Sequence, residues 1–323
     1  MNFKILLSTL AIVLIAGCVI PGIDTGGTIL GGGNGVAITS FTAEPTEAYS
    51  GNIVRVTLEV QNLGGTAVAN TSSVVHLIGT NAKLSETTNN DYWHGKTAGT
   101  NDVKEIRHFT RNLTPADSIK GTPANIEKLT WNLVAPSITA GQKRLDSFTA
   151  RVYSDYSSGV NGNIWVYNQS EAEATKSAGK ALKTSSFTPV VGPVSVNVKL
   201  SPDPVVLYPG ENTFTFSIDV TNSGTGVIYK NNTISYSSSS PSFSLDSDTQ
   251  LHYINIDVKS SDLTISDCKG DQQIFGGKSM TLVCSVTINS GSDVSTFKSF
   301  PLNVIAKYGY YIDGETSVTV QGK

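Results

Sequence analysis

The chain has 323 residues, a formal net charge of −3 and 15% charged side chains, well below the roughly 25% of typical soluble proteins. So weak a charge gives no electrostatic basis for binding nucleic acid or an anionic membrane surface. The length accommodates two domains of ordinary size.

Residues 1–17 are predicted to be a secretory signal that is removed from the mature protein. Lys4 precedes an apolar run from Ile5 to Ile15, which is shorter than the roughly 20 residues that cross a bilayer as a helix. A charged start, a short apolar core and small residues at its end are typical of such signals.

The end of this run, Ile15-Ala16-Gly17-Cys18, resembles the lipobox of prokaryotic lipoproteins. In that family the chain is cut before the cysteine, and the new N-terminal thiol carries a lipid. The resemblance implies a lipid on Cys18 and an extracytoplasmic protein that is anchored to the cell membrane and exposed at the cell surface. An ordinary signal peptide with an incidental cysteine is the alternative.

Residues 18–35 are rich in glycine, and residues 36–168 are rich in short apolar alternations. Glycine loses much conformational entropy on ordering, so the first segment predicts a flexible tether. The second predicts a β-sandwich, because a period of two indicates strands with one buried and one solvated face. The clearest alternation is Val54, Val56, Leu58 and Val60.

A polar, irregular stretch at 81–125 interrupts this first module. It is too long for a plain connection in a compact domain and is predicted to be a decorated insertion.

The segment 169–193 differs in composition from its surroundings and predicts a linker between modules. Residues 169–183 are rich in Ala, Glu and Lys, and Ser170 and Glu173 have the spacing of a capping box at the start of a helix. Pro189 and Pro193 then favour an extended connection.

Residues 194–323 repeat features of the first module. Phe214-x-Phe216-x-Ile218-x-Val220 is followed by Asn222-x-Gly224, as Val54 to Val60 is followed by Asn62-x-Gly64. Near the ends, Tyr153 and Tyr156 match Tyr308 and Tyr311 at equal spacing. The fold class predicted is therefore all-β, with two tandem antiparallel sandwiches joined by a short helix.

This repeated pattern resembles the immunoglobulin-like domains of prokaryotic surface proteins, in particular the CARDB (cell-adhesion-related) type. The resemblance covers the first half of each module best and implies adhesion, surface architecture or the spacing of other domains. It transfers no catalytic residue. Both a bacterial and an archaeal envelope stay open, and few cysteines, low charge and the candidate sequons lean slightly towards the archaeal one.

Two cysteines remain beyond Cys18, namely Cys268 and Cys284. In an exported protein an even pair most simply forms a disulfide. Structural zinc usually needs four ligands, so a metal site from this pair is disfavoured.

Tyr92, Trp93 and His94 form an aromatic triplet in the polar insertion. Exposed aromatic rings on a loop can stack on sugars or anchor a protein interface. The triplet is therefore a candidate ligand platform. The alternative is that the insertion folds back and covers Trp93.

Four N-x-S/T sequons are candidate glycosylation sites on an exported surface, at Asn70, Asn112, Asn168 and Asn231. None of the four histidines has a zinc-ligand spacing such as H-E-x-x-H, and no G-x-S-x-G nucleophile elbow occurs. The sequence predicts no catalytic residue, no metal and no cofactor.

The function predicted is that of a non-catalytic, lipid-anchored surface protein that acts in adhesion or envelope architecture, with envelope proteins or surface glycans as partners. A carbohydrate- or solute-binding lipoprotein and a filament subunit are the alternatives. The aromatic triplet would serve the former, and strand addition at a sheet edge the latter.

Overall fold

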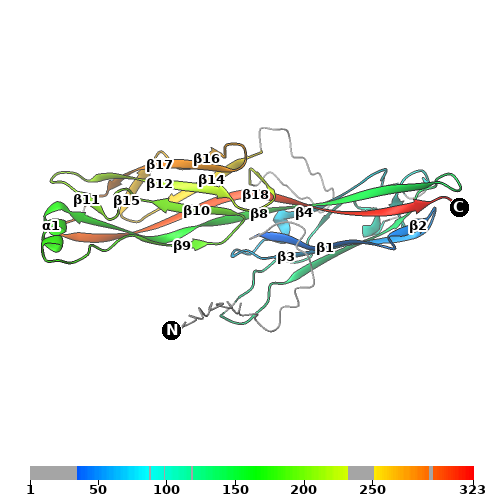
Figure 1. Ribbon diagram of the computed structural model, residues 1–323, viewed down its shortest axis with the longest axis horizontal. Helices are drawn as coiled ribbons and strands as arrows, with labels where there is room; N and C mark the ends of the chain where they lie inside the picture. The colour runs from blue at the N-terminus through cyan, green and yellow to red at the C-terminus, as the bar shows by residue number, and fades with distance from the viewer. Residues whose placement is uncertain (1–34, 87–88, 98, 118, 232–250, 291–293) are drawn as a thin grey trace, which may run out of the picture.

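The computed structural model describes residues 35–86, 89–97, 99–117, 119–231, 251–290 and 294–323. It is almost entirely β-structure, and its sheets are mainly antiparallel. Two units lie end to end along an elongated body (Figure 1). The all-β prediction is confirmed.

The first unit has one four-stranded sheet of its own. Its inward side chains alternate as predicted, with Val54, Val56, Leu58 and Val60 fully buried. The spatial order of the sheet is β1 (Val36–Glu44), β3 (Ile53–Asn62), β7 (Ile126–Val134) and β5 (His94–Gly95).

The second unit has a four-stranded sheet with the same order of equivalent strands. Val194 pairs with Asn222 here, as Val36 pairs with Asn62 in the first unit. The order is β10 (Val194–Lys199), β12 (Thr213–Asn222), β17 (Ser279–Ile288) and β15 (Leu263–Ser266).

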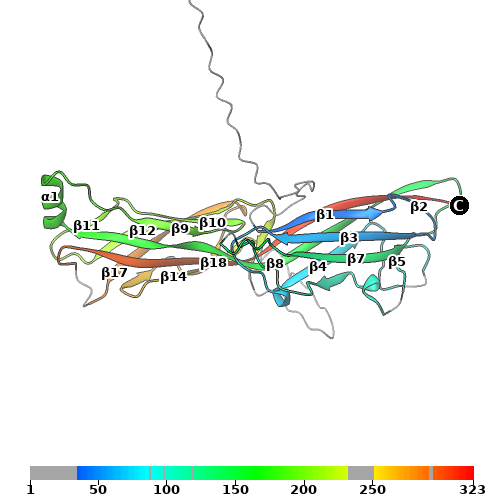
Figure 2. The ribbon, with the colours of Figure 1, turned by 90° about the horizontal axis from the view of Figure 1, so that it is seen from below.

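The other face of both units is a single ten-stranded sheet. Two very long strands run through it, β8 (Lys143–Asn168) and β18 (Phe297–Gln321), and they pair without interruption from Phe297↔Tyr167 to Gln321↔Lys143. Both extend along the length of the molecule (Figures 1 and 2). Their further neighbours are β4 (Ser73–Gly79), β6 (Ile106–His108), β14 (Tyr253–Lys259), β16 (Gly270–Gln273), β2 (Glu47–Tyr49), β13 (Val227–Tyr229), β9 (Ser186–Val190) and β11 (Val205–Leu207).

The two long strands are exchanged between the units. β8 pairs with β4 in the first unit and, further along, with β9 and β11 in the second. β18 pairs with β14 in the second unit and ends beside β2 in the first. The chain is therefore not divided into the successive modules predicted at 36–168 and 194–323, because the end of each long strand completes the other unit.

The arrangement has an approximate two-fold relation. In the antiparallel register Tyr156 faces Tyr308, and Tyr153 faces Tyr311. The centre of the relation lies at Asp155 and Gly309, at the waist between the units. Most of the buried apolar side chains of both units form one contiguous cluster, and Val74, Tyr153 and Tyr229 form a second, small one.

The insertion at 81–125 folds back onto the first unit. It adds β5 to the edge of the four-stranded sheet and β6 to the edge of the shared sheet. It also contains the short 3-10 turn Asn101–Val103, and a second such turn, Asn70–Ser72, precedes β4. Its apolar residues join the core of this unit, namely Leu84, Trp93, Phe109 and Leu113.

The predicted linker contains one short helix, α1 (Gln169–Ser177). Its N-cap is Asn168, whose Oδ1 accepts a hydrogen bond from Glu171 N at 2.8 Å, so the predicted capping role of Ser170 is wrong. α1 lies at one end of the molecule, and the C-terminus lies at the other (Figure 1). In the described part of the chain, no helix has the length and apolar character needed to span a membrane.

The shared strands predict that both units unfold together. Leu58 on β3 and Ile218 on β12 occupy equivalent positions, and both are fully buried. Leu58→Ala and Ile218→Ala should each cost about 2–5 kcal/mol through lost burial and a cavity. Each should move one common unfolding transition, followed by calorimetry and by denaturant titration. Two resolved transitions, of which each variant moves only one, would contradict the coupling.

Candidate binding surfaces

The aromatic triplet does not form a ligand platform. The Trp93 side chain is fully buried, and its Nε1 donates to Asp146 Oδ2 at 2.8 Å. Its ring packs edge-on against Phe148 with centroids 5.2 Å apart. His94 is also buried, and its Nδ1 lies 3.0 Å from Tyr92 O. The candidate platform is wrong and the alternative, in which the insertion folds back and covers Trp93, is confirmed, because the indole lies inside the sandwich.

Two buried carboxylates connect the insertion to the two sheets. Asp146 on β8 accepts the hydrogen bond from Trp93 and also forms an ion pair with Arg144, whose Nη2 lies 2.9 Å from Asp146 Oδ2. Glu127 on β7 accepts from the Thr110 backbone N and hydroxyl, both at 2.8 Å. Buried carboxylates are stable only when paired and hydrogen-bonded, and both are. Asp146 and Glu127 therefore each have a structural role.

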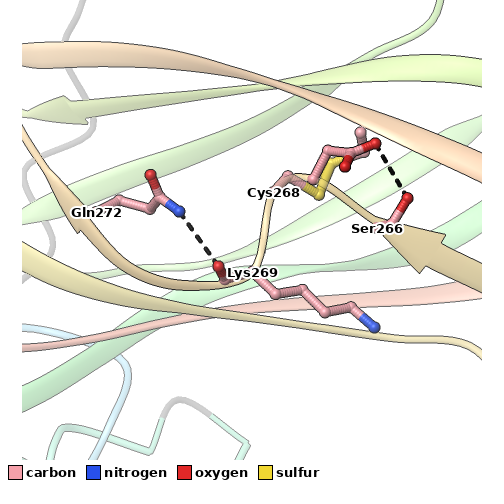
Figure 3. The surroundings of a disulfide bond; sticks show 6 residues. Ser266, Cys268, Lys269 and Gln272 are labelled. Atoms are coloured by element: carbon pink, nitrogen blue, oxygen red, sulfur yellow. Dashed lines mark hydrogen bonds between the residues drawn. A yellow bond between two sulfur atoms is a disulfide. The ribbon is translucent and has the colours of Figure 1, made fainter.

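The predicted disulfide between Cys268 and Cys284 is confirmed. Cys268 lies between β15, in the four-stranded sheet, and β16, in the shared sheet, while Cys284 lies on β17. The bond therefore fixes the corner at which the chain crosses between sheets (Figure 3). Closing a loop of this length contributes about 3 kcal/mol in the chain-entropy model.

The four sequon asparagines differ in what holds their side chains. Asn112 is exposed, and its Oδ1 accepts from Asn70 N at 2.9 Å, while Asn70 and Asn231 are partly buried. Asn168 uses its Oδ1 as the helix cap and its Nδ2 as a donor to Ser295 O. A glycan on Asn168 would displace the latter contact. The remaining predicted modification site, Cys18, lies outside the described residues.

Tyrosines from the long strands fasten the repeated Asn-x-Gly turns at the waist. Tyr156 OH donates to Asn62 Oδ1 at 3.3 Å, and Tyr310 OH donates to Asn222 Oδ1 at 3.4 Å. In the repeat, the structural equivalent of Tyr156 is thus Tyr310. The sequence spacing had matched Tyr156 to Tyr311, and that match is wrong.

A second group of tyrosines closes the outer face of the waist. The ring centroid of Tyr153 lies 6.0 Å from the ring centroid of Tyr229 and 5.3 Å from that of Tyr311. A Cβ at Gly309 would overlap the Tyr229 ring, so only glycine fits between the ring and β18. Burial raises the pKa of the Tyr229, Tyr308 and Tyr310 hydroxyls. The described residues of the waist are therefore tightly packed around these rings.

Each end of the molecule presents an exposed tyrosine on an equivalent turn. Tyr49 is the last residue of β2 and is 50% exposed, and Tyr208 follows β11 and is 59% exposed. Both turns are closed by backbone hydrogen bonds, from Asn52 N to Tyr49 O at 2.9 Å and from Glu211 N to Tyr208 O at 3.0 Å. Glycines with positive φ, Gly51 and Gly210, permit the reversal.

Two hollows adjoin Tyr208, with volumes of about 310 Å³ and 610 Å³. Tyr208 and Gln169 line both of them. The smaller hollow has a polar rim of Asn168, Ser170, Glu211 and Asn212. The larger lies against α1 and is lined by Glu173, Lys176, Lys180, Thr184 and Asp203 with Pro202 and Pro204. This end of the second unit, the Tyr208 tip, is the candidate site, and an aromatic residue directly before Pro209-Gly210 was its only signal in the sequence.

Within the described residues, no cluster of three or more His, Cys, Asp and Glu side chains could hold a metal ion. A search of the sequence against models of known protein families and against curated proteins finds no match to either.

The contacts of Asp146 predict a large effect of its removal. Asp146→Ala leaves the buried Trp93 indole N–H without its acceptor and the partly exposed Arg144 guanidinium without its partner, which should destabilise the protein by about 1–3 kcal/mol. The matched control is Glu59→Ala, which breaks the more exposed 2.9 Å pair with Lys128 in the same unit and should cost about 1 kcal/mol or less. Equal losses in urea titrations of the two variants would refute the structural role of Asp146.

The waist tyrosines predict alkaline unfolding. A buried tyrosine whose folded pKa lies above that of the unfolded chain keeps its proton in the folded state, so stability is lost as pH rises through about 10. Tyrosinate absorbance should therefore rise steeply together with loss of β-sheet circular dichroism. Gradual ionisation that precedes any structural change would count against buried hydroxyls at the waist.

Proposed function

We propose that this chain is a non-catalytic, membrane-anchored surface protein whose two immunoglobulin-like modules form a rigid rod for adhesion or envelope architecture. The observation that carries the proposal is the exchange of β8 and β18. Because both strands run unbroken through both units, the units cannot hinge independently as modules on a flexible linker do. A fixed spacing between two ends suits a spacer or a bridging adhesin.

The order of the strands supports the immunoglobulin-like assignment. One sheet of the first unit, β1-β3-β7-β5, corresponds to strands A, B, E and D of that fold, and β8 and β4 correspond to F and C. The partner in the G position is the second half of β18. In an ordinary module F and G are consecutive in the chain, whereas here each unit takes its G strand from the other half of the chain.

The position of Gly35 supports a tether that joins the rod at the waist. Gly35 O accepts from Leu63 N at 2.8 Å, and Gly35 lies against the ring of Pro193, where β10 begins. A lipid on Cys18 would therefore hold the rod near its middle. Both ends would then be free to meet partners.

The lipid anchor is tested on the native protein. The mature chain should begin at Cys18 and carry the mass of a lipid, and Cys18→Ala should move the protein from the membrane fraction to a soluble or uncleaved form. An unmodified Cys18, or another first residue, in intact-mass measurements would remove the anchor from the proposal.

The role in adhesion or architecture is tested by cross-linking on intact cells, followed by mass spectrometry of the linked peptides. We expect links from exposed lysines near the two ends, such as Lys176, Lys180 and Lys323, to other envelope proteins or to a second copy of the chain. Recovery of intramolecular links alone would overturn the proposal.

A further inference from the structure

We propose that the Tyr208 tip is a binding site for a neutral carbohydrate chain. The inference deepens the proposed adhesive function and rests on it for the exposure of this tip at the cell surface. The geometry and the chemistry of the tip carry the rest.

The turn that carries Tyr208 has a fixed backbone conformation, and it exposes the ring for stacking. Glu211 closes the turn twice, since its N donates to Tyr208 O and its Oε2 accepts from Tyr208 N at 3.2 Å. The backbone that presents the ring is thus fixed before any ligand arrives, which lowers the entropic cost of binding. In the described part of the chain, no aromatic ring or cation packs against the Tyr208 ring, whereas the Nζ of Lys183 lies 4.6 Å from the ring centroid of Trp165.

The side chains around the Tyr208 ring include both hydrogen-bond donors and hydrogen-bond acceptors. Planar amides and a hydroxyl line the smaller hollow, and Gln169 bridges to the larger one. Gln169 is itself oriented, since its Nε2 donates to Glu173 Oε1 at 2.8 Å. An aromatic face beside oriented amides and carboxylates matches the faces and hydroxyls of a sugar ring. The two hollows have volumes in the range of small-molecule sites.

The charges around the tip favour a neutral ligand. In the larger hollow Lys176 and Lys180 are offset by Glu173 and Asp203. An anionic ligand would need an excess of cations, and an apolar helix would need a continuous apolar groove. Neither is present among the residues that line the hollows.

The site is tested by direct binding with the full chain, purified in a detergent without a sugar headgroup. The probes are neutral oligosaccharides of hexoses and N-acetylhexosamines, with acidic oligosaccharides as a comparison. We expect wild type to bind a neutral probe, and Tyr208→Ala to weaken that binding by at least about tenfold, equivalent to about 1.4 kcal/mol. Tyr208→Phe keeps the ring and should retain binding.

Tyr49→Ala is the matched control, because Tyr49 occupies the equivalent turn at the opposite end and should leave binding unchanged. Melting temperatures of all variants should equal that of wild type, since both side chains are exposed. Binding of no neutral probe, equal binding by Tyr208→Ala, or preference for acidic probes would each overturn the site. Envelope cross-links that persist in Tyr208→Ala cells would show that the proposed function stands without it.

Discussion

The exchange of β8 and β18 is the constraint on which the rest of the structure depends. A sandwich needs both of its sheets complete before its core is closed to water. In each unit one strand of the shared sheet comes from the far half of the chain, so neither core is complete until the whole chain has folded. The contiguous apolar cluster across the waist is the energetic counterpart of this topology.

The sequence predicts the local elements well because they depend on local patterns. The alternation from Val54 to Val60 and its repeat around Ile218 specify which faces are buried, and Asn62-x-Gly64 and Asn222-x-Gly224 mark equivalent turns. No comparable sequence pattern indicates that β8 and β18 are exchanged between the units. A strand that passes from one unit to the next has the same period of two as a strand that turns back, so β8 and β18 each look like two separate strands. The boundary predicted near residue 168 follows from this ambiguity.

Side-chain roles were predicted less well where they depend on distant partners. Trp93 lies in a polar stretch, and its burial requires Asp146 and Phe148, which are more than fifty residues away. Tyr310, rather than Tyr311, matches Tyr156, because the side chain that reaches the Asn-x-Gly turn is selected by the face of the strand and not by spacing. By contrast, Cys268 and Cys284 could be paired correctly from the sequence, because the chain has three cysteines and the lipobox resemblance already accounted for Cys18.

The exchange also explains why two equivalent ends differ. β8 carries the chain to the far end of the second unit, yet β10 begins at the waist. The segment between them must therefore travel back. It turns at α1 and returns as β9, which pairs with β8 from Gly159 to Asn163. Among the described residues, α1 has no helical counterpart at the first end, where β18 lies beside β2. The helix that supplies Gln169 and Glu173 to the Tyr208 tip is thus a consequence of the topology, and it builds a two-sided site at one end of an otherwise repeated scaffold.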